Sequence, residues 1–235
     1  MFLRSEKYYD AIYGTMGKNY VAEAKIIHEL VQKHKRTEGN ALLDIACGTG
    51  SHAGVLSKYY KVEGLDYDKG MLTVARRKYP NLKFQYGNMI DFSLTRKFDI
   101  ITCLFSSIGY ARTKANLRKS IKTMADHLVS GGVLLVEPWF TPTQWNTGRV
   151  HTTHVNNDDL KLTRMSFSSK KGNISSIDFH YLIGSSAGVE YFTEKHELGL
   201  FTHEEYMTAF QEAKLKTFHN KKGLDGRGLY VGIKA

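Results

Sequence analysis

The residues best suited to chemistry are a glycine-rich turn and two carboxylates near it. The turn, Ala-Cys-Gly-Thr-Gly at residues 46–50, follows a short apolar run that carries Asp44. Glycines at such a turn let the backbone approach a ligand closely, and the helix expected after it offers free N–H groups at its start. A second short run, residues 61–66, ends in Asp66, where a carboxylate can accept hydrogen bonds from both hydroxyls of a ribose. The pattern predicts a nucleoside-binding unit of strand, helix and strand.

The turn departs from the dinucleotide-binding pattern Gly-x-Gly-x-x-Gly. With Gly48 and Gly50 as the first two glycines, the third position falls on Ala53, which only the looser form of the pattern allows. A purely structural turn that binds no ligand is the alternative. The strand, the turn and the acid in register favour a nucleoside over that alternative.

Length and composition indicate a globular chain of the α/β class. Its 235 residues, 42% of them hydrophobic, fit one domain with an inserted subdomain. No apolar run is long enough to span a membrane, and the first residues lack the core of a signal peptide. Cys47 and Cys103 lie at the ends of expected core strands, so we expect buried, reduced thiols in a cytoplasmic protein.

The net charge of +10 favours a polyanionic partner, which is either a nucleic acid or a phosphorylated small molecule. Lysines and arginines are scattered along the chain, and the densest run is only His-Lys-Arg at 34–36. No basic stripe of the kind that binds nucleic acid is evident. A nucleic-acid partner is therefore not favoured.

Helices and strands alternate in the pattern of the first 140 residues, as in a parallel sheet. A helix over 202–215 and a final pair of strands, joined by a turn at 223–228, end the chain. The other expected helices cover 18–39, 51–60, 68–79 and 113–129, and the expected strands after the first cover 61–66, 82–86, 98–105 and 133–136.

Residues 141–200 change to a period of two, which is typical of strands with one buried face. Ile177, Phe179 and Tyr181 alternate with polar residues, and turns at 171–173 and 185–188 separate the runs. We expect three or four antiparallel strands inserted after the fifth parallel strand. They would form a cap over the carboxyl edge of the main sheet.

Further candidates lie in loops and strand ends. Glu137 follows the fifth parallel strand, where a carboxylate is either a functional group or a solvated residue at the rim. Arg227 stands between two glycines, on backbone that a ligand can approach closely; an ordinary exposed turn residue is the alternative. His151 and His154 have no cysteine or acidic partner at the spacing of a metal site, so no metal is expected.

Motifs over nearly the whole chain point to one family. Leu-Asp-Ile-Ala-Cys-Gly-Thr-Gly at 43–50 resembles motif I of class I S-adenosylmethionine-dependent methyltransferases. Four others resemble, more narrowly, the N,N-dimethyltransferases of dTDP-3-amino-3,6-dideoxyhexoses. They are Phe-Ser-Ser-Ile-Gly-Tyr at 105–110, Val-Glu-Pro-Trp at 136–139, His-Glu-Leu-Gly-Leu-Phe at 196–201 and Gly-Arg-Gly-Leu-Tyr-Val-Gly at 226–232.

This resemblance implies a Rossmann-like class I methyltransferase fold, with a mostly parallel seven-stranded sheet. Residues 1–140 and 201–235 would form the domain that binds S-adenosylmethionine, and residues 141–200 the inserted antiparallel cap. The implied activity is N-methylation of the amino group of a dTDP-linked aminodeoxyhexose. The sequence also allows a homodimer.

The resemblance further implies the roles of individual residues. Tyr13 and Tyr110 would flank the reacting amine as catalytic residues, and Tyr13 and Tyr20 would form a lid over the cofactor. Arg227 would face the substrate diphosphate with a two-pronged guanidinium, and Glu137 and His196 would also bind the acceptor. The residues expected to bind S-adenosylmethionine are Tyr20, Asp44, Ala46, Gly48, Gly50, Asp66, Asn88, Met89 and Phe105.

Asn88 departs from the family, which has an aspartate that accepts a hydrogen bond from the adenine amino group. The amide oxygen of Asn88 can still accept that bond, without the charge. Phe140 replaces a second tryptophan, and Gly-Leu-Asp at 223–225 replaces Gly-Pro-Ser.

The implied chemistry needs few catalytic groups. A sulfonium is a good leaving group, so positioning and desolvation of a neutral amine supply most of the rate. An amine near neutral pH can lose its proton to water, and we therefore expect no strong catalytic triad.

Other function classes stay open at this point. A tRNA or rRNA methyltransferase is compatible with the basic charge, but residues 105–108 are not the Asn-Pro-Pro-Tyr type of motif usual there. A cofactor-binding subunit without catalysis, a dehydrogenase of the same architecture, or a methyltransferase with another small-molecule acceptor are the further alternatives.

Overall fold

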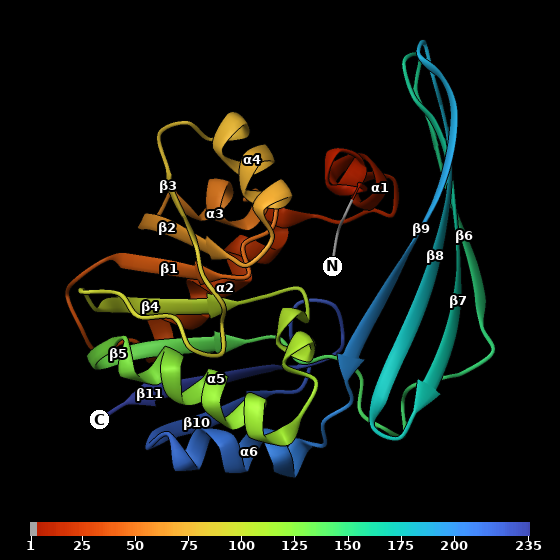
Figure 1. Cartoon of the computed structure of the whole chain (residues 1–235). Helices are drawn as coiled ribbons and strands as arrows, with labels where there is room; N and C mark the ends of the chain where they lie inside the picture. The colour runs from red at the N-terminus through yellow and green to blue at the C-terminus, as the bar shows by residue number, and fades with distance from the viewer. Residues whose placement is uncertain (1–3) are drawn as a thin grey trace.

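The computed structural model describes residues 4–235, which form two separate β-sheets (Figure 1). The larger sheet has seven strands in the order β10-β11-β5-β4-β1-β2-β3. All its neighbouring pairs are parallel except those that involve β11. Its strands are β1 (Ala41–Ile45), β2 (Lys61–Asp66), β3 (Lys83–Tyr86), β4 (Phe98–Cys103), β5 (Leu128–Val136), β10 (Leu215–Asn220) and β11 (Leu229–Lys234).

Helices cover both faces of the larger sheet. Leu42 and Leu43 of β1 point to opposite faces, because successive side chains of a strand alternate. On the Leu42 face pack α2 (Tyr20–His34), α3 (Ser51–Leu56) and α4 (Lys69–Lys78); on the Leu43 face pack α5 (Lys114–Asp126) and α6 (His203–Glu212). None of the helices in the described part of the chain is long and apolar enough to cross a membrane.

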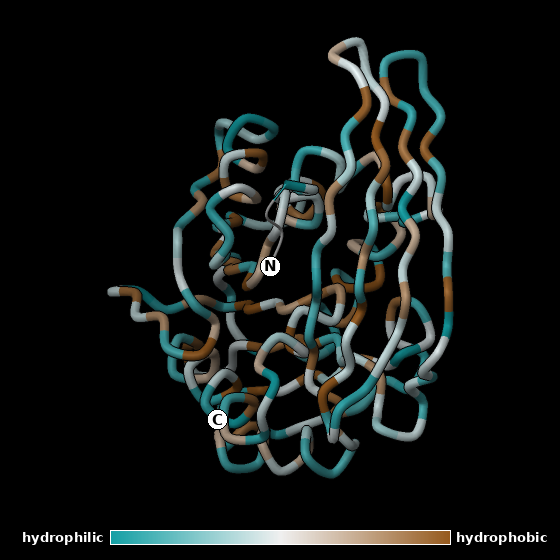
Figure 2. The backbone as a smooth tube through the Cα atoms, turned by 45° about the vertical axis from the view of Figure 1, so that its right-hand side comes forward, coloured by the Kyte–Doolittle hydropathy of each residue, from teal (hydrophilic) through white to brown (hydrophobic). Residues whose placement is uncertain are grey.

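The smaller sheet stands beside the carboxyl end of the larger one (Figure 1). Its four strands are antiparallel, in the order β6 (Val150–Asn156), β7 (Lys161–Lys171), β8 (Ile174–Ser185) and β9 (Gly188–Gly199). Apolar and polar residues recur in turn along these strands (Figure 2), and Phe179, Tyr181 and Phe192 are buried on the inner face. A short helix, α1 (Tyr9–Thr15), preceded by the 3₁₀ turn η1 (Glu6–Tyr8), packs against that face through Ile12.

The expected fold class is confirmed. The larger sheet is seven-stranded and mostly parallel, and the period-two segment forms the antiparallel strands. The helix α6 begins with a capping box, in which the Thr202 and Glu205 side chains accept hydrogen bonds from each other's backbone N–H groups.

Several expected element bounds are wrong. The helix expected over 18–39 begins only at Tyr20, because Asn19 caps it: the Asn19 side chain accepts a hydrogen bond from the Ala22 N–H at 3.0 Å. It ends at His34 because Lys35 turns extended to lead into β1. The helix expected over 51–60 ends already at Leu56.

The glycines at 131–132 lie between the helix expected over 113–129 and the strand expected over 133–136, and both of these expected bounds are wrong. The helix α5 ends at Asp126, and β5 begins at Leu128 and runs through both glycines. Gly131 has a φ of +78°, and the pairing of β5 with β4 shifts register nearby. The strand therefore tolerates a local irregularity that glycine permits. The strand expected over 98–105 ends at Cys103.

Candidate active site

A cavity of about 1390 Å³ lies at the carboxyl ends of the parallel strands. Its wall combines loops that follow β1 to β5 with residues on the inner face of the smaller sheet, such as Arg164 and Phe179. Pockets for a single small molecule usually enclose about 300–1,000 Å³, so this one has room for two ligands side by side. The carboxyl edge is where open α/β sheets bind ligands.

The turn after β1 brings backbone to the cavity. Ala46 and Gly48 line it, with φ angles of +55° and +56°. The Gly48 N–H donates to Asp66 Oδ2 at 2.7 Å, which fixes the turn to the end of β2. A Cβ on Gly50 would come within 2.9 Å of the Phe84 ring, so this glycine is required for packing and does not line the cavity.

Two buried carboxylates lie at this end of the sheet. Asp66 lines the cavity and accepts the Asp68 N–H at 2.8 Å, and burial raises its pKa to about 6. Asp44 lies below the turn and accepts the Thr102 hydroxyl at 2.7 Å, and burial raises its pKa to about 6 as well. Within residues 4–235 neither carboxylate forms an ion pair. The site therefore carries negative charge that a cationic ligand would neutralise.

Asn88 and Met89 line the cavity at the end of β3. The Asn88 side-chain oxygen accepts the Ile90 N–H at 3.0 Å. That oxygen is thus already used once, and the NH₂ group of Asn88, a donor, is left for a ligand. The acceptor role expected for this residue would have to use the second lone pair of the same oxygen.

The helix α1 covers the cavity from one side. Asp10 accepts hydrogen bonds from the Thr49 hydroxyl at 2.7 Å and the Ser51 hydroxyl at 3.0 Å, and it forms an ion pair with Lys78. These bonds attach α1 to the glycine turn. The attachment holds Tyr9 and Tyr13 over the cavity, which both residues line.

An ion cluster lies next to α1. Lys18 and His52 contact the two oxygens of Glu23 at 2.6 and 2.7 Å, and all three side chains are buried. The Lys18 ammonium also lies 3.9 Å from the centroid of the Phe105 ring, at the cavity wall. Tyr20 packs edge-on against His52 and faces this cluster instead of the cavity.

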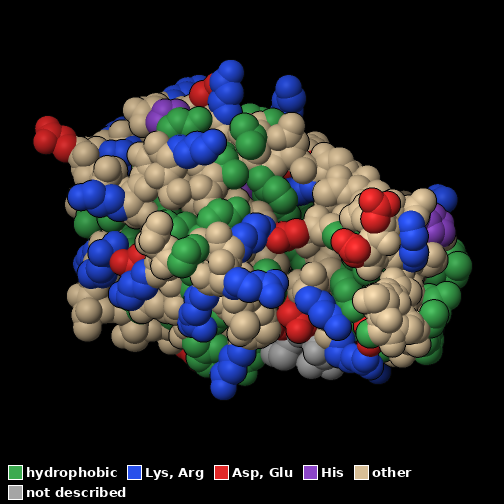
Figure 3. Space-filling model, turned by 90° about the horizontal axis from the view of Figure 1, so that it is seen from above, with side chains coloured by type: hydrophobic (Ala, Val, Ile, Leu, Met, Phe, Trp, Pro, Cys, Tyr) green, Lys and Arg blue, Asp and Glu red, His purple; other side chains and the backbone are tan. Residues whose placement is uncertain are grey.

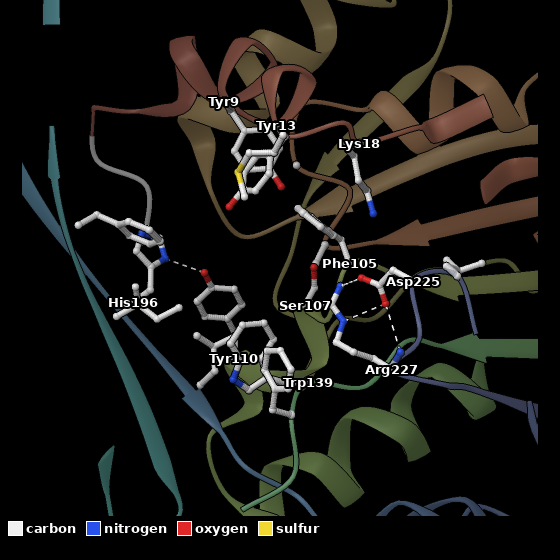
Figure 4. A pocket seen from close by; sticks show the side chains of 18 of the residues that line it. Tyr9, Tyr13, Lys18, Phe105, Ser107, Tyr110, Trp139, His196, Asp225 and Arg227 are labelled. Carbon is white, nitrogen blue, oxygen red and sulfur yellow. Dashed lines mark hydrogen bonds and ion pairs between the residues drawn. The ribbon is translucent and has the colours of Figure 1, made fainter. Parts of the chain in front are cut away.

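On the opposite wall Tyr110 and His196 meet (Figure 4). Tyr110 belongs to the 3₁₀ turn η2 (Ser107–Ala111), and His196 to β9. The Tyr110 hydroxyl lies 2.6 Å from His196 Nδ1, and both residues line the cavity. Burial lowers the pKa of His196 and raises that of Tyr110. Both groups are therefore neutral at pH 7.

Arg227 enters the cavity from the turn before β11, between aromatic rings and carboxylates (Figure 4). Its guanidinium carbon lies 5.7 Å from the ring centroids of Trp139 and Phe140. Its Nε and Nη2 donate to Asp225, and Nη2 also lies 3.2 Å from Glu137 Oε1. Asp225 thus occupies one edge of the guanidinium that is expected to face the substrate diphosphate.

Glu137 is a positioning residue in this arrangement. It is completely buried, accepts the Phe105 N–H at 2.6 Å through its other oxygen, and does not line the cavity. The carboxylate joins the loop after β4 to Arg227. Direct contact of Glu137 with the acceptor, expected from the sequence, does not fit this placement.

Comparisons with known proteins agree with these features. Residues 42–132 match the methyltransferase domain family. The chain is 39% identical, over 96% of its length and 89% of the relative's, to dTDP-3-amino-3,6-dideoxy-alpha-D-glucopyranose N,N-dimethyltransferase of Streptomyces fradiae. It is 38% identical to the dTDP-3-amino-3,4,6-trideoxy-alpha-D-glucopyranose N,N-dimethyltransferase of Streptomyces venezuelae, over 97% of this chain and 96% of that protein.

The chain belongs to the S-adenosylmethionine-dependent amino-sugar N-methyltransferases. The crystal structure of Streptomyces venezuelae DesVI superposes with a TM-score of 0.93 at 37% identity, and each chain is covered completely. A second neighbour is S-adenosylmethionine-bound CalS10, an amino pentose methyltransferase from Micromonospora echinaspora involved in calicheamicin biosynthesis. It has a TM-score of 0.87 at 32% identity and covers 100% of this chain and 98% of its own.

The cavity of this N-methyltransferase fits its cofactor, S-adenosylmethionine. Asp66 faces the cavity with lone pairs available to hydroxyls, and open space lies beside Gly48, where a Cβ would meet nothing within 4 Å. The negative charge of Asp44 and Asp66 suits a sulfonium. Among residues 4–235 no group of three or more His, Cys, Asp or Glu side chains could hold a metal ion.

The structure brings most of the expected site residues to one cavity. Tyr20, Asp44, Gly50 and Glu137 are the exceptions; they support its wall from behind. The residues expected from the sequence that line the cavity are Tyr13, Ala46, Gly48, Asp66, Asn88, Met89, Phe105, Tyr110, His196 and Arg227.

The sequence analysis missed several residues of the wall. One of them is Tyr9, which lines the cavity beside Tyr13. Arg164 is 7% exposed on the inner face of β7, and its guanidinium lies over the rings of Tyr13 and Phe179. A charged residue at an inward position of a period-two strand is a signal that could have identified it.

Proposed function

We propose that this methyltransferase transfers a methyl group from S-adenosylmethionine to the amino group of a dTDP-linked aminodeoxyhexose. The observation that carries the proposal is one cavity lined both by loops at the carboxyl ends of the large sheet's strands and by residues of the small sheet's inner face. Two relatives more than 35% identical, matched over almost the whole chain, are named for this reaction. The shared fold and the sequence identity thus support the same class of acceptor.

The cofactor lobe consists of the loops after β1 to β4. We assign the ribose to Asp66 and the adenine to Asn88 and Met89, since all three line the wall at neighbouring strand ends. Ala46 and Gly48 would meet the methionine part. When bound, S-adenosylmethionine supplies an electrophilic methyl group; the chain's own residues orient the amine and exclude water.

The acceptor lobe consists of η2, the loop after β5 and the inner face of the small sheet. Tyr13 and Tyr110 would lie on either side of the amine. Arg227 would contact the diphosphate, with Trp139 and Phe140 as apolar walls around it. We keep residues 141–200 as the acceptor-side cap, inserted into a cofactor domain of residues 1–140 and 201–235.

We further propose that the protein is located in the cytoplasm and that it forms a homodimer. Both cysteines are free and buried, which is compatible with the reducing cytoplasm. Self-association into a homodimer is a matter for sedimentation analysis.

The test is a comparison of acceptors under the same conditions. A dTDP-linked aminodeoxyhexose, the corresponding free amino sugar and a mixed tRNA are each incubated with labelled S-adenosylmethionine. We expect label in the nucleotide sugar, much less in the free sugar and none in RNA. Equal labelling of both sugars would contradict recognition of the nucleotide part, and labelling of RNA would favour the RNA-methyltransferase alternative.

A further inference from the structure

A line of three side chains leads from the cavity into the smaller sheet. It begins with the Tyr110 hydroxyl, 2.6 Å from His196 Nδ1 (Figure 4). His196 Nε2 then lies 3.6 Å from Glu194 Oε2. His196 is 2% exposed and Glu194 4%, so only the Tyr110 end and the edge of the imidazole meet the cavity. Buried polar groups in such a line orient one another strongly, because water cannot replace a partner.

Glu194 is fixed by the segment before α1. It accepts the Arg4 N–H at 2.9 Å, the Ser5 N–H at 3.0 Å and the Ser5 hydroxyl at 2.6 Å. These donors satisfy an ionised carboxylate and hold it in place. An ionised Glu194 favours a proton on the facing Nε2 of His196. Nδ1 is then the lone-pair nitrogen and accepts the hydrogen bond of Tyr110.

We propose that Tyr110, His196 and Glu194 form a proton relay that deprotonates the acceptor ammonium inside the cavity. The inference rests on the proposed function, and it departs from the expectation that water alone takes the proton of the amine. The ammonium N–H proton passes to the Tyr110 oxygen while the Tyr110 proton passes to His196 Nδ1. The products are a neutral amine, a neutral tyrosine and an imidazolium that Glu194 stabilises. No further reactant is needed.

Such a relay matters most for a second methyl transfer. The first transfer leaves a secondary ammonium, which has no lone pair until it loses a proton. If that ion stays in the cavity beneath α1, bulk water is poorly placed to take the proton. A relay that starts at the cavity wall would let the second transfer proceed without release of the monomethyl product.

The charges around His196 suit a proton acceptor. Burial is the main reason that its pKa is lowered, and Arg164 from β7 acts in the same direction. Glu194 acts in the opposite direction. Tyr9 and Tyr13 from the α1 helix, Tyr181 from β8 and Asp66 from β2 are further titratable groups near Tyr110. His196 is therefore neutral, and able to accept, at the pH where the substrate is an ammonium.

The test is the pH dependence of kcat/KM for a dTDP-linked aminohexose. The wild-type enzyme with a relay uses the ammonium form, so kcat/KM should be flat between the pKa of His196 and that of the free amine. His196→Asn must use the neutral amine from solution. Its kcat/KM should rise about tenfold per pH unit up to the pKa of the amine, and the monomethyl product should accumulate.

The outer face of the same sheet offers a matched control. His180 Nδ1 lies 2.6 Å from the Tyr191 hydroxyl, on β8 and β9, and both residues are exposed. His180→Asn should keep the flat profile. Glu194→Gln should steepen the profile, whereas Glu190→Gln, which also loses a contact to Arg4 but has a side chain that is 33% exposed, should not.

A loss of rate by the same factor at every pH in His196→Asn would show a structural role and overturn the relay. If that variant does not fold, Tyr110→Phe, which removes only the hydroxyl, must show the sloped profile, and a flat profile there overturns the relay equally. A wild-type enzyme that methylates no dTDP-linked amine would overturn the proposed function together with the relay. Activity in the wild type and a flat profile in both variants would overturn the relay alone.

Discussion

Burial raises the pKa values of the Asp44 and Asp66 carboxyl groups to about 6. A cationic cofactor favours their ionised forms, so its binding should release protons in the range where they titrate. As pH falls through 6 the carboxylates take up protons, and the affinity for S-adenosylmethionine should fall. The decrease should approach tenfold per pH unit for each coupled group.

Calorimetry between pH 5 and 8, in buffers of different ionisation enthalpy, would measure both the affinity and the released protons. Asp66→Asn should bind the cofactor more weakly at pH 7 and show a flatter pH dependence. Asp126→Asn, an exposed change on α5, is the control. If the affinity of the wild type were constant over this pH range, the ionised forms of Asp44 and Asp66 would not contribute to cofactor binding.

In the absence of cofactor, the same two carboxylates make the folded state less stable as pH rises, whereas the affinity for the cofactor increases with pH. Their folded pKa values are raised, so the folded state binds more protons than the unfolded state between about pH 4 and 6. Their contribution to stability is full below about pH 4 and is lost as pH rises through 6. Cofactor binding should therefore raise Tm more at pH 8 than at pH 5.

Asp225 competes with any anion for Arg227, because it already occupies one edge of the guanidinium. Asp225→Asn removes that negative charge and should lower the KM of the nucleotide sugar several-fold. Arg227→Ala should lower kcat/KM by tens-fold, since a hydrogen bond to a charged group contributes about 1.5–3 kcal/mol. Arg227→Lys should recover only part of that loss.

Steady-state kinetics with the nucleotide sugar measures these effects, and cofactor affinity should stay unchanged in all three variants. Arg118→Ala, a loss of the same charge on exposed α5, is the control. An Asp225→Asn enzyme with a higher KM would mean that Asp225 organises the turn for binding and does not compete with the substrate.

At the scale of elements, the helix α1 forms one side of the cavity wall through Tyr9 and Tyr13. Asp10 attaches it to the glycine turn and to Lys78 of α4. Its side chain is 35% exposed, so the ion pair is screened, and we expect a moderate effect. Asp10→Asn should raise the dissociation rate of S-adenosylmethionine about three- to tenfold and leave the association rate nearly unchanged.

Stopped-flow fluorescence would follow both rates. Hydrogen exchange of residues 9–15 should also slow when the cofactor binds. If the cofactor dissociates as slowly from Asp10→Asn as from the wild type, the contacts of Asp10 with the glycine turn and Lys78 do not help α1 to retain the cofactor.

The sequence predicted features that depend on local patterns. The turn at 46–50, Asp66 at a strand end and the period-two strands each follow from residues close together in the chain. Contacts between distant segments could not be predicted in this way. Ser5 meets Glu194 across 189 positions, and Arg227 meets Glu137 across 90, so neither spacing carries a signal.

The misplaced cofactor residues have a related cause. A motif identifies which residues occur at a site, but it does not distinguish side chains on the wall from those behind it. Gly50 is at the site because a larger residue would collide with Phe84, and Asp44 because it links β1 to β4 through the Thr102 hydroxyl. Whether a residue touches a ligand or holds the residue that does is decided by packing.

The charge of the whole molecule, +10, is distributed without a single basic stripe on the face seen from above. Lysine and arginine side chains are interspersed there with acidic and uncharged ones (Figure 3). Generic RNA should therefore bind weakly, and a modest increase in salt should abolish the binding. The charge is better understood as favouring the approach of a small phosphorylated acceptor.

The most direct test of the account is to identify the product formed from one acceptor. The enzyme is incubated with dTDP-3-amino-3,6-dideoxyglucose and methyl-labelled S-adenosylmethionine, and the product is analysed by mass spectrometry and NMR. We predict one and then two labelled methyl groups, both on the amino nitrogen, without added metal. Methyl groups on a hydroxyl, or no transfer to any dTDP-linked amine while the cofactor binds normally, would contradict the assignment.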